Sequence, residues 1–244
     1  MRTSNPALND ATFDNLALSG EETMSIKGTV NKSFMLIALV VSTAYLSWDF
    51  VTKSESGMAY TIGAAILGFI IAMVTVFKPT WSPYTAPAYA LFEGVFLGAI
   101  SGYFESQFSG IVIQAVLLTC GTFICLLLAY KSGWIKATEN FKLGIIAATG
   151  AVGLIYLASM ILGMFGIHIP MIHDNGIVGI GFSVVVVVIA ALNLVLDFDF
   201  IEQGEAKGAP KYMEWYAAFG LLVTLVWLYL EILKLLAKLA SRRD

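Results

Sequence analysis

The sequence predicts an all-α membrane protein with seven transmembrane helices. The mean hydropathy is +0.81. Of the 244 residues, 58% are hydrophobic and 13% are charged, whereas charged residues average about 25% in soluble domains. The apolar residues gather in runs of about 20, the length that a helix needs to cross a bilayer. Runs such as residues 184–189 lack the alternation of a strand, so we expect helices, whose backbones satisfy their own hydrogen bonds in hydrocarbon.

The expected helices follow one another with short polar or helix-breaking segments between them. Breaks are indicated by Pro79 and Pro83 after the second helix, by Gly133 after the fourth and by Pro210 before the last. A re-entrant last segment is the alternative to a seventh full crossing. The expected spans are residues 30–48, 58–77, 84–104, 111–130, 143–167, 176–197 and 215–237.

The termini and the basic residues predict the organisation and the orientation of the chain. We expect a polar cytoplasmic tail over residues 1–29, a transmembrane domain over 30–239 and a short C-terminal tail over 240–244. The N-terminal tail has no basic region followed by an apolar core, so a cleavable signal peptide is not expected. Most Lys and Arg residues between the helices lie on the N-terminal side, which the positive-inside rule assigns to the cytoplasm. Only the basic C-terminus favours the re-entrant alternative.

Three acidic residues, Glu93, Asp197 and Glu231, lie inside or at the edge of expected spans. A carboxylate at the bilayer centre costs roughly 2.5–3.5 kcal/mol on insertion scales, so such residues usually face a bundle interior or a water-filled cavity. They are therefore candidates for a pH-sensing site or an ion pathway that carries protons or cations. Asn193, four residues before Asp197, shares its helix face and is a supporting residue.

Two of these acids also have a purely structural interpretation. Glu93 directly precedes a stripe of small residues, which lets a neighbouring helix approach, so a protonated Glu93 could form an interhelical hydrogen bond. Glu231 could form an interfacial ion pair with Lys234, three residues further along the helix. The stripe beside Glu93 consists of Gly94, Gly98 and Gly102, and glycines of the same expected role are Gly63, Gly68, Gly150 and Gly153.

Other classes of function are excluded or weakly supported by the sequence. There is no basic patch for nucleic acid, no catalytic motif and little chain outside the expected spans to form a catalytic domain. Cys120 and Cys125 lie on different sides of one helix, and we interpret them as packing residues. His168, His173 and Asp174 do not have the spacing of a metal site. We therefore expect neither an enzyme nor a resident metal or cofactor.

Several short segments, in this order along the chain, resemble the Bax inhibitor-1 family of integral membrane proteins. The start of the chain, Met1-Arg2-Thr3-Ser4-Asn5-Pro6, and the stretch from Leu192 to Leu239 resemble a bacterial branch of that family. The segments that carry the resemblance are Leu91-Phe92-Glu93-Gly94, Leu196-Asp197 and Leu228-Tyr229-Leu230-Glu231-Ile232-Leu233.

The resemblance implies six helices around a central seventh and a pH-sensitive calcium leak in the bacterial inner membrane. It also implies that Asp197 and Glu231 share a proton and gate the leak, with Glu231 standing where the family usually has Asp. Two carboxylates in a low-dielectric site cannot both ionise cheaply, so the sharing is physically reasonable. At about 1.5 Å per residue, however, Glu231 lies roughly 24 Å into the last helix. By depth alone Glu93 is the better partner for Asp197, so all three stay in one candidate cluster.

A second function remains open beside the leak of calcium or protons through the bilayer. Bacterial relatives are similar to proteins that modulate a membrane-bound protease. The alternative is therefore a non-conducting regulatory protein that acts by binding such a partner.

Overall fold

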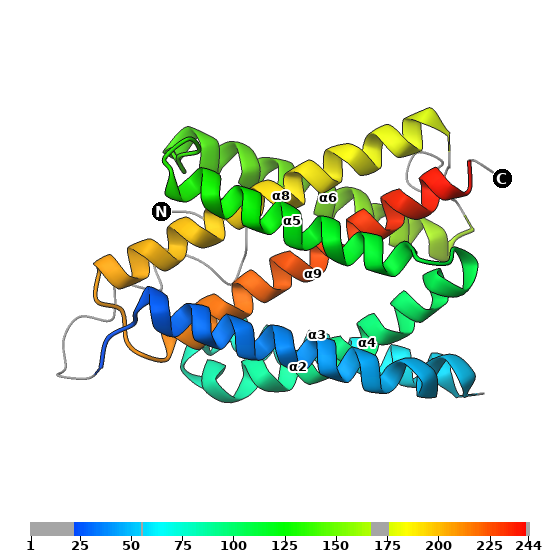
Figure 1. The fold of residues 1–244 in the computed structure, drawn as a ribbon, viewed down its shortest axis with the longest axis horizontal. Coiled ribbons are helices and arrows are strands. Elements are labelled where there is room, and N and C mark those ends of the chain that lie inside the picture. The colour runs from blue at the N-terminus through cyan, green and yellow to red at the C-terminus, as the bar shows by residue number, and fades with distance from the viewer. Residues whose placement is uncertain (1–21, 55, 167–175, 243–244) are drawn as a thin grey trace. The chain divides into compact units, whose positions relative to one another are not determined.

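The computed structural model describes residues 22–54, 56–166 and 176–242, and the long elements in these ranges are α-helices (Figure 1). The one β pairing described there is an isolated bridge between Thr23 and Pro210. Each expected span coincides with a helix, so the all-α prediction is confirmed. The helices are α2 (Ile26–Lys53), α3 (Gly57–Phe77), α4 (Ser82–Gln107), α5 (Ile111–Lys131), α6 (Glu139–Met164), α8 (Ile177–Ala206) and α9 (Met213–Ala240), with a 3-10 helix η1 (Pro79–Trp81) before α4.

Six of these helices are long and apolar enough to cross a membrane, namely α2, α3, α5, α6, α8 and α9. Helix α4 is the exception because Glu93, Glu105 and several Ser, Tyr and Gly residues lower its hydropathy. The protein is thus a multi-pass membrane protein in contact with lipid, and the prediction of seven spans is confirmed for six of them. In the most apolar window of α9, 61% of the residues are buried, against 17% in α2. The arrangement of six helices around α9 stays a prediction.

Several helices begin or end outside the predicted limits because local capping groups extend them. Helix α2 begins at Ile26 rather than at residue 30, and the hydroxyl of Ser25 accepts a hydrogen bond from the backbone N–H of Gly28. Thr138 caps α6 in the same way, through the N–H of Phe141. Residues 168, 173 and 174, and most of the predicted N-terminal tail, lie outside the described residues.

The described chain forms two compact units. The N-terminal unit comprises residues 22–54, 56–109 and 199–223, and the C-terminal unit comprises residues 110–166, 176–198 and 224–242. Helices α8 and α9 each contribute to both units. The acidic residues of interest are therefore divided, with Glu93 in the first unit and Asp197 and Glu231 in the second.

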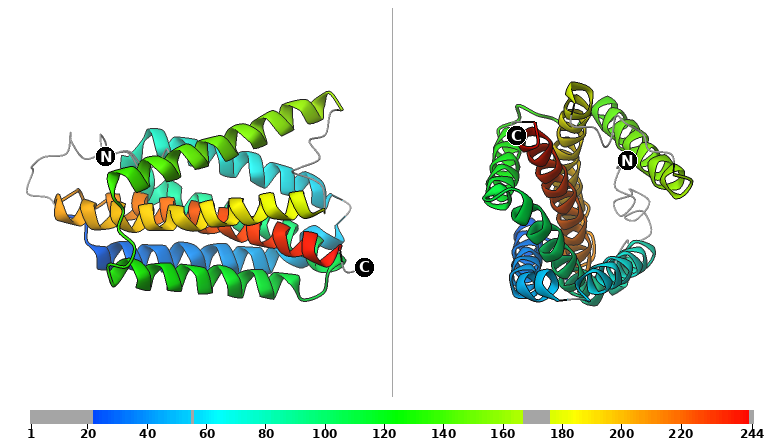
Figure 2. Two further views of the ribbon diagram at one scale, coloured as in Figure 1. Left: turned by 90° about the horizontal axis from the view of Figure 1, so that it is seen from above. Right: turned by 90° about the vertical axis from the view of Figure 1, so that its right-hand side faces the viewer.

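In the N-terminal unit, α4 packs along α2 and also contacts α3 (Figure 2). A Cβ atom on Gly94 would lie 2.6 Å from the carbonyl oxygen of Val40, and one on Gly98 would lie 2.5 Å from that of Ala44. The predicted close approach at this stripe is therefore confirmed for both glycines.

The other glycines do not all behave as predicted. A Cβ atom on Gly63, Gly150 or Gly153 would meet no described atom within 4 Å. The packing prediction is wrong for these three, because no helix of the described residues lies within contact distance of the side on which they lie. A Cβ atom on Gly68 would be in ordinary van der Waals contact with Phe92 and Glu93 of α4.

Candidate functional site: buried carboxylates

Asp197 and Glu231 are both buried in the C-terminal unit, with 1% and 2% of their surfaces exposed. Asp197 lies on α8, one turn after Asn193, as the spacing predicts. The side-chain amide of Asn193 donates hydrogen bonds to Thr149 Oγ1 of α6 and to the carbonyl oxygen of Ile189, both at 2.8 Å. Asn193 therefore ties the polar face of α8 to α6 close to Asp197.

Glu231 of α9 lies in a cluster of three side chains. Its Oε2 accepts a hydrogen bond from the hydroxyl of Tyr156 on α6 at 2.9 Å, and its Oε1 accepts one from Lys234 Nζ at 3.0 Å. The same ammonium lies 5.1 Å from the centre of the Tyr156 ring. The ion pair considered as an alternative for Glu231 is thus present, but its carboxylate is buried rather than interfacial. Tyr156 was not among the residues predicted from the sequence, where its signal was a hydroxyl in an otherwise apolar run.

A contact near the end of α9 indicates how α8 and α9 are aligned in the C-terminal unit. Lys238 Nζ donates to the Ser183 hydroxyl at 2.9 Å and to the carbonyl oxygen of Gly179 at 3.0 Å. The proton that Asp197 and Glu231 are expected to share stays a prediction.

Glu93 belongs to the N-terminal unit and lies at the contact between α4 and α3. Its Oε2 lies 3.7 Å from the position of a Cβ atom on Gly68. Its side chain also forms a hydrogen bond with Tyr89, one turn earlier on α4. The ring of Tyr89 packs edge-on against Phe219 of α9, with centroids 5.0 Å apart. Its predicted position near a helix–helix contact is therefore confirmed, and its role in a pathway stays a prediction.

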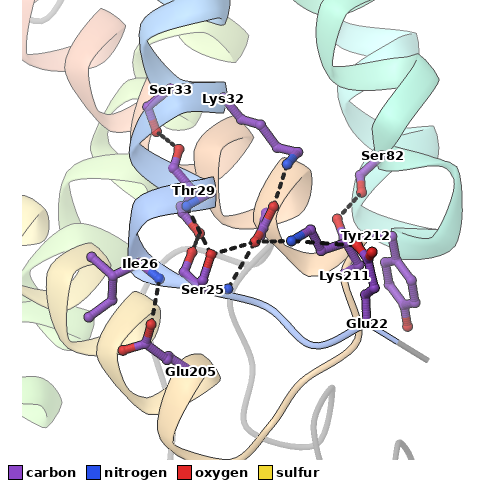
Figure 3. A network of polar contacts seen from close by, with 12 residues as sticks. Glu22, Ser25, Ile26, Thr29, Lys32, Ser33, Ser82, Glu205, Lys211 and Tyr212 are labelled. Atoms are coloured by element: carbon purple, nitrogen blue, oxygen red, sulfur yellow. Dashed lines mark hydrogen bonds and ion pairs between the residues drawn. The ribbon is translucent and has the colours of Figure 1, made fainter. Parts of the chain in front are cut away.

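A third buried carboxylate, Glu214 in the first turn of α9, was not among the residues predicted from the sequence. It is 0% exposed and accepts hydrogen bonds from the backbone N–H and the hydroxyl of Ser25, both at 2.9 Å. Lys32 Nζ donates to Glu214 Oε2, and Lys211 Nζ lies 3.3 Å from Glu214 Oε1 (Figure 3). Sequence patterns could not reveal this site because its partners are separated by 189 residues for Ser25 and 182 for Lys32.

The surrounding contacts attach the start of α2 to the turn between α8 and α9. The backbone N–H of Met24 donates to the carbonyl oxygen of Ala209 at 2.6 Å. The backbone N–H of Lys211 donates to the backbone carbonyl oxygen of Glu22 at 3.0 Å. Glu205 accepts from the N–H of Ile26 at 2.9 Å (Figure 3). Carboxylates at the first N–H groups of a helix also interact favourably with its dipole. We call this set, residues 22–32 with 205–214, the N-terminal clamp.

These groups can hold protons and cations, but they do not form a preformed metal centre. Among the described residues, no group of three or more His, Cys, Asp or Glu side chains could hold a metal ion.

The comparison with known proteins agrees with the segments that predicted the family. No curated protein and no solved structure matches the chain. A family model described as Bax inhibitor 1 like matches residues 5–241, which is nearly the whole chain. The chain therefore belongs to the Bax inhibitor 1-like family.

Proposed function

We propose that this protein is a non-catalytic, pH-sensitive cation leak of the bacterial cytoplasmic membrane, with calcium as the principal ion. The observation that carries the proposal is the burial of Asp197 and Glu231, 1% and 2% exposed, on two helices apolar enough to span a bilayer. Carboxylates in such surroundings are retained where they serve ion pathways or proton relays. Carboxylate oxygens are also the ligands that calcium prefers.

The proposed gating follows from competition between protons and cations for the same oxygen atoms. A protonated carboxyl is neutral and stable among apolar side chains, whereas an ionised one requires a cation or a polar partner. A change in protonation would therefore bias α9 between two packings, with Asn193 supporting Asp197 from one turn away. Glu93 is the third carboxylate that the proposal assigns to the pathway.

A liposome assay tests this function without any partner protein. Purified protein would be reconstituted in vesicles with a trapped calcium indicator and assayed between about pH 6 and 8, the interval in which buried carboxylates commonly titrate. We expect calcium entry above that of empty vesicles, with a rate that depends on pH. A rate equal to that of empty vesicles at every pH would reject the leak.

The second candidate is a regulatory protein that does not conduct and binds a partner such as a membrane protease. It is favoured by the N-terminal clamp, because backbone hydrogen bonds from Met24 and Lys211 fix the start of α2 beside the α8–α9 turn. The N-terminal tail predicted from the sequence would then be the segment that such a partner recognises. Absence of flux together with binding of the residues 1–21 segment to a purified partner would support it.

A further inference from the structure

The ion pair between Lys234 and Glu231 is asymmetric in a way that a simple structural pair is not. The carboxylate is 2% exposed and held by Tyr156, whereas the lysine side chain is 46% exposed. One partner is therefore fixed inside the unit and the other lies at its boundary. The Lys234 ammonium occupies one oxygen of Glu231, Oε1, at 3.0 Å.

We propose that Lys234 is a tethered cation that occupies the cation position of Glu231, so that a mobile cation must displace it to pass. This inference rests on the proposed function and adds a way in which the cation leak is regulated. Lysine suits the role because its ammonium is a compact charge on a flexible stem of four carbons. Lys234 is three residues after Glu231 on the same helix, so the ammonium can leave and return without any movement of α9.

The side chains around Glu231 favour a cation at its carboxylate, and they show which lysine supplies that cation. With Lys234 on Glu231, its ammonium also lies over the Tyr156 ring, an additional attraction for a cation. Lys238, one turn further along α9, already donates to Gly179 and Ser183 of α8. Lys238 is therefore committed to α8, and Lys234 is the lysine that the described contacts assign to Glu231.

The inference makes a directional prediction for Lys234→Met, which keeps an unbranched side chain but removes the charge. The carboxylate then retains Tyr156 and lacks its own cation, so soluble calcium should bind there more readily. We expect calcium entry into liposomes to rise by about tenfold, the factor that corresponds to ~1.4 kcal/mol. Lys234→Arg should resemble the unchanged protein. Lys131→Met, at the end of α5, is the control because it removes the same charge from an exposed position in the same unit.

A binding measurement separates failure of this inference from failure of the leak. Thermal unfolding of the detergent-solubilised protein would be followed with and without calcium. We expect calcium to raise the Tm of Lys234→Met more than that of the unchanged protein, and this gain to disappear in the double variant E231Q/K234M. If no variant conducts but this Tm pattern holds, Lys234 occupies a cation site and the leak is rejected.

The opposite result rejects the role of Lys234 as a displaceable cation and leaves the proposed leak intact. If the unchanged protein conducts and Lys234→Met matches Lys131→Met in flux and in Tm shift, then Lys234 is a structural partner only. Should Lys234→Met fail to fold, Lys234→Gln carries the same test with a polar side chain. Failure of both neutral variants to fold while Lys234→Arg folds would overturn the inference, because the ion pair would then be required for the fold.

Discussion

The carboxylate of Glu214 fills the space where a side chain on Gly28 would begin. A Cβ atom built on Gly28 would lie 2.0 Å from Glu214 Oε1 and 2.4 Å from Oε2. The absence of a side chain at this position therefore admits the carboxylate to the first turn of α2. There it reaches Ser25 and Lys32 at the same time.

Replacement of Gly28 by alanine tests this relationship. The added methyl group must displace Glu214 from Ser25 and Lys32, so we expect a loss of about 1–3 kcal/mol, the usual effect of overpacking. Thermal unfolding in detergent would measure it. Gly63→Ala in α3 is the matched control, because its Cβ would meet no described atom within 4 Å. Equal unfolding temperatures for the two variants would contradict the geometry.

The Lys32–Glu214 pair makes a prediction about charge. Lys32→Met leaves the fully buried carboxylate with Ser25 and the more distant Lys211, and removal of one partner from a buried pair typically costs about 3–5 kcal/mol. Because Lys32 is itself 17% exposed, we expect a value near the lower end. Lys27→Met, an exposed lysine of the same helix, should unfold like the unchanged protein. Proteolysis near residue 25 should accelerate in the first variant and not in the second.

Gly98 makes a prediction about helix packing. Its missing side chain lets α4 approach the backbone of Ala44, which cannot rotate away as a side chain can. We expect Gly98→Ala to lower the free energy of unfolding by about 1–3 kcal/mol. Gly150→Ala in α6 has open space at the corresponding position and should be close to neutral. A large loss in the α6 variant would mean that a neighbour covers Gly150 in the membrane.

The roles of the acids can be separated by combining substitutions in the flux assay. Asp197→Asn keeps the size and hydrogen-bonding capacity of the side chain but cannot ionise, so it mimics the protonated state. We expect it to remove most of the pH dependence of calcium entry. If Asp197 and Glu231 share one proton, adding Glu231→Gln should change little, whereas additive effects would indicate two separate steps.

Glu93 supplies the comparison for that experiment. If Glu93 is the partner of Asp197, Glu93→Gln should abolish the pH response and Glu231→Gln should not. An unchanged pH profile in Asp197→Asn would assign Asp197 a structural role and leave the leak without its proposed sensor.

The sequence was sufficient to predict the helices and the family, because apolar run length and helix breakers are local signals. Pro79 and Pro210 lie between the long α-helices as predicted, whereas Pro83 is the second residue of α4, where a helix tolerates proline. The Gly94 and Gly98 contacts were also predictable, since a four-residue spacing puts small residues on one helix face. Gly150 shows the limit of that argument, because spacing on one helix does not reveal whether another helix covers that face.

The polar contacts of the site were less predictable, for a different physical reason. The partners of Glu231 were found only in part: Lys234 is three residues away on the same helix, but Tyr156 lies on α6. Glu214 looked like an ordinary charged residue at the start of a helix. Its burial depends on Ser25, Gly28 and Lys32, which no local pattern connects to it.

The N-terminal clamp has a consequence for the order in which the protein can be made. Lys32 is synthesised with α2, but Glu214 follows 182 residues later. Until α9 leaves the ribosome, the ammonium of Lys32 must stay in water or among lipid headgroups, where a long basic side chain can reach. The start of α2 is therefore completed by the last helix, and a chain that stops before residue 214 should present an unfinished N-terminus to quality-control proteases.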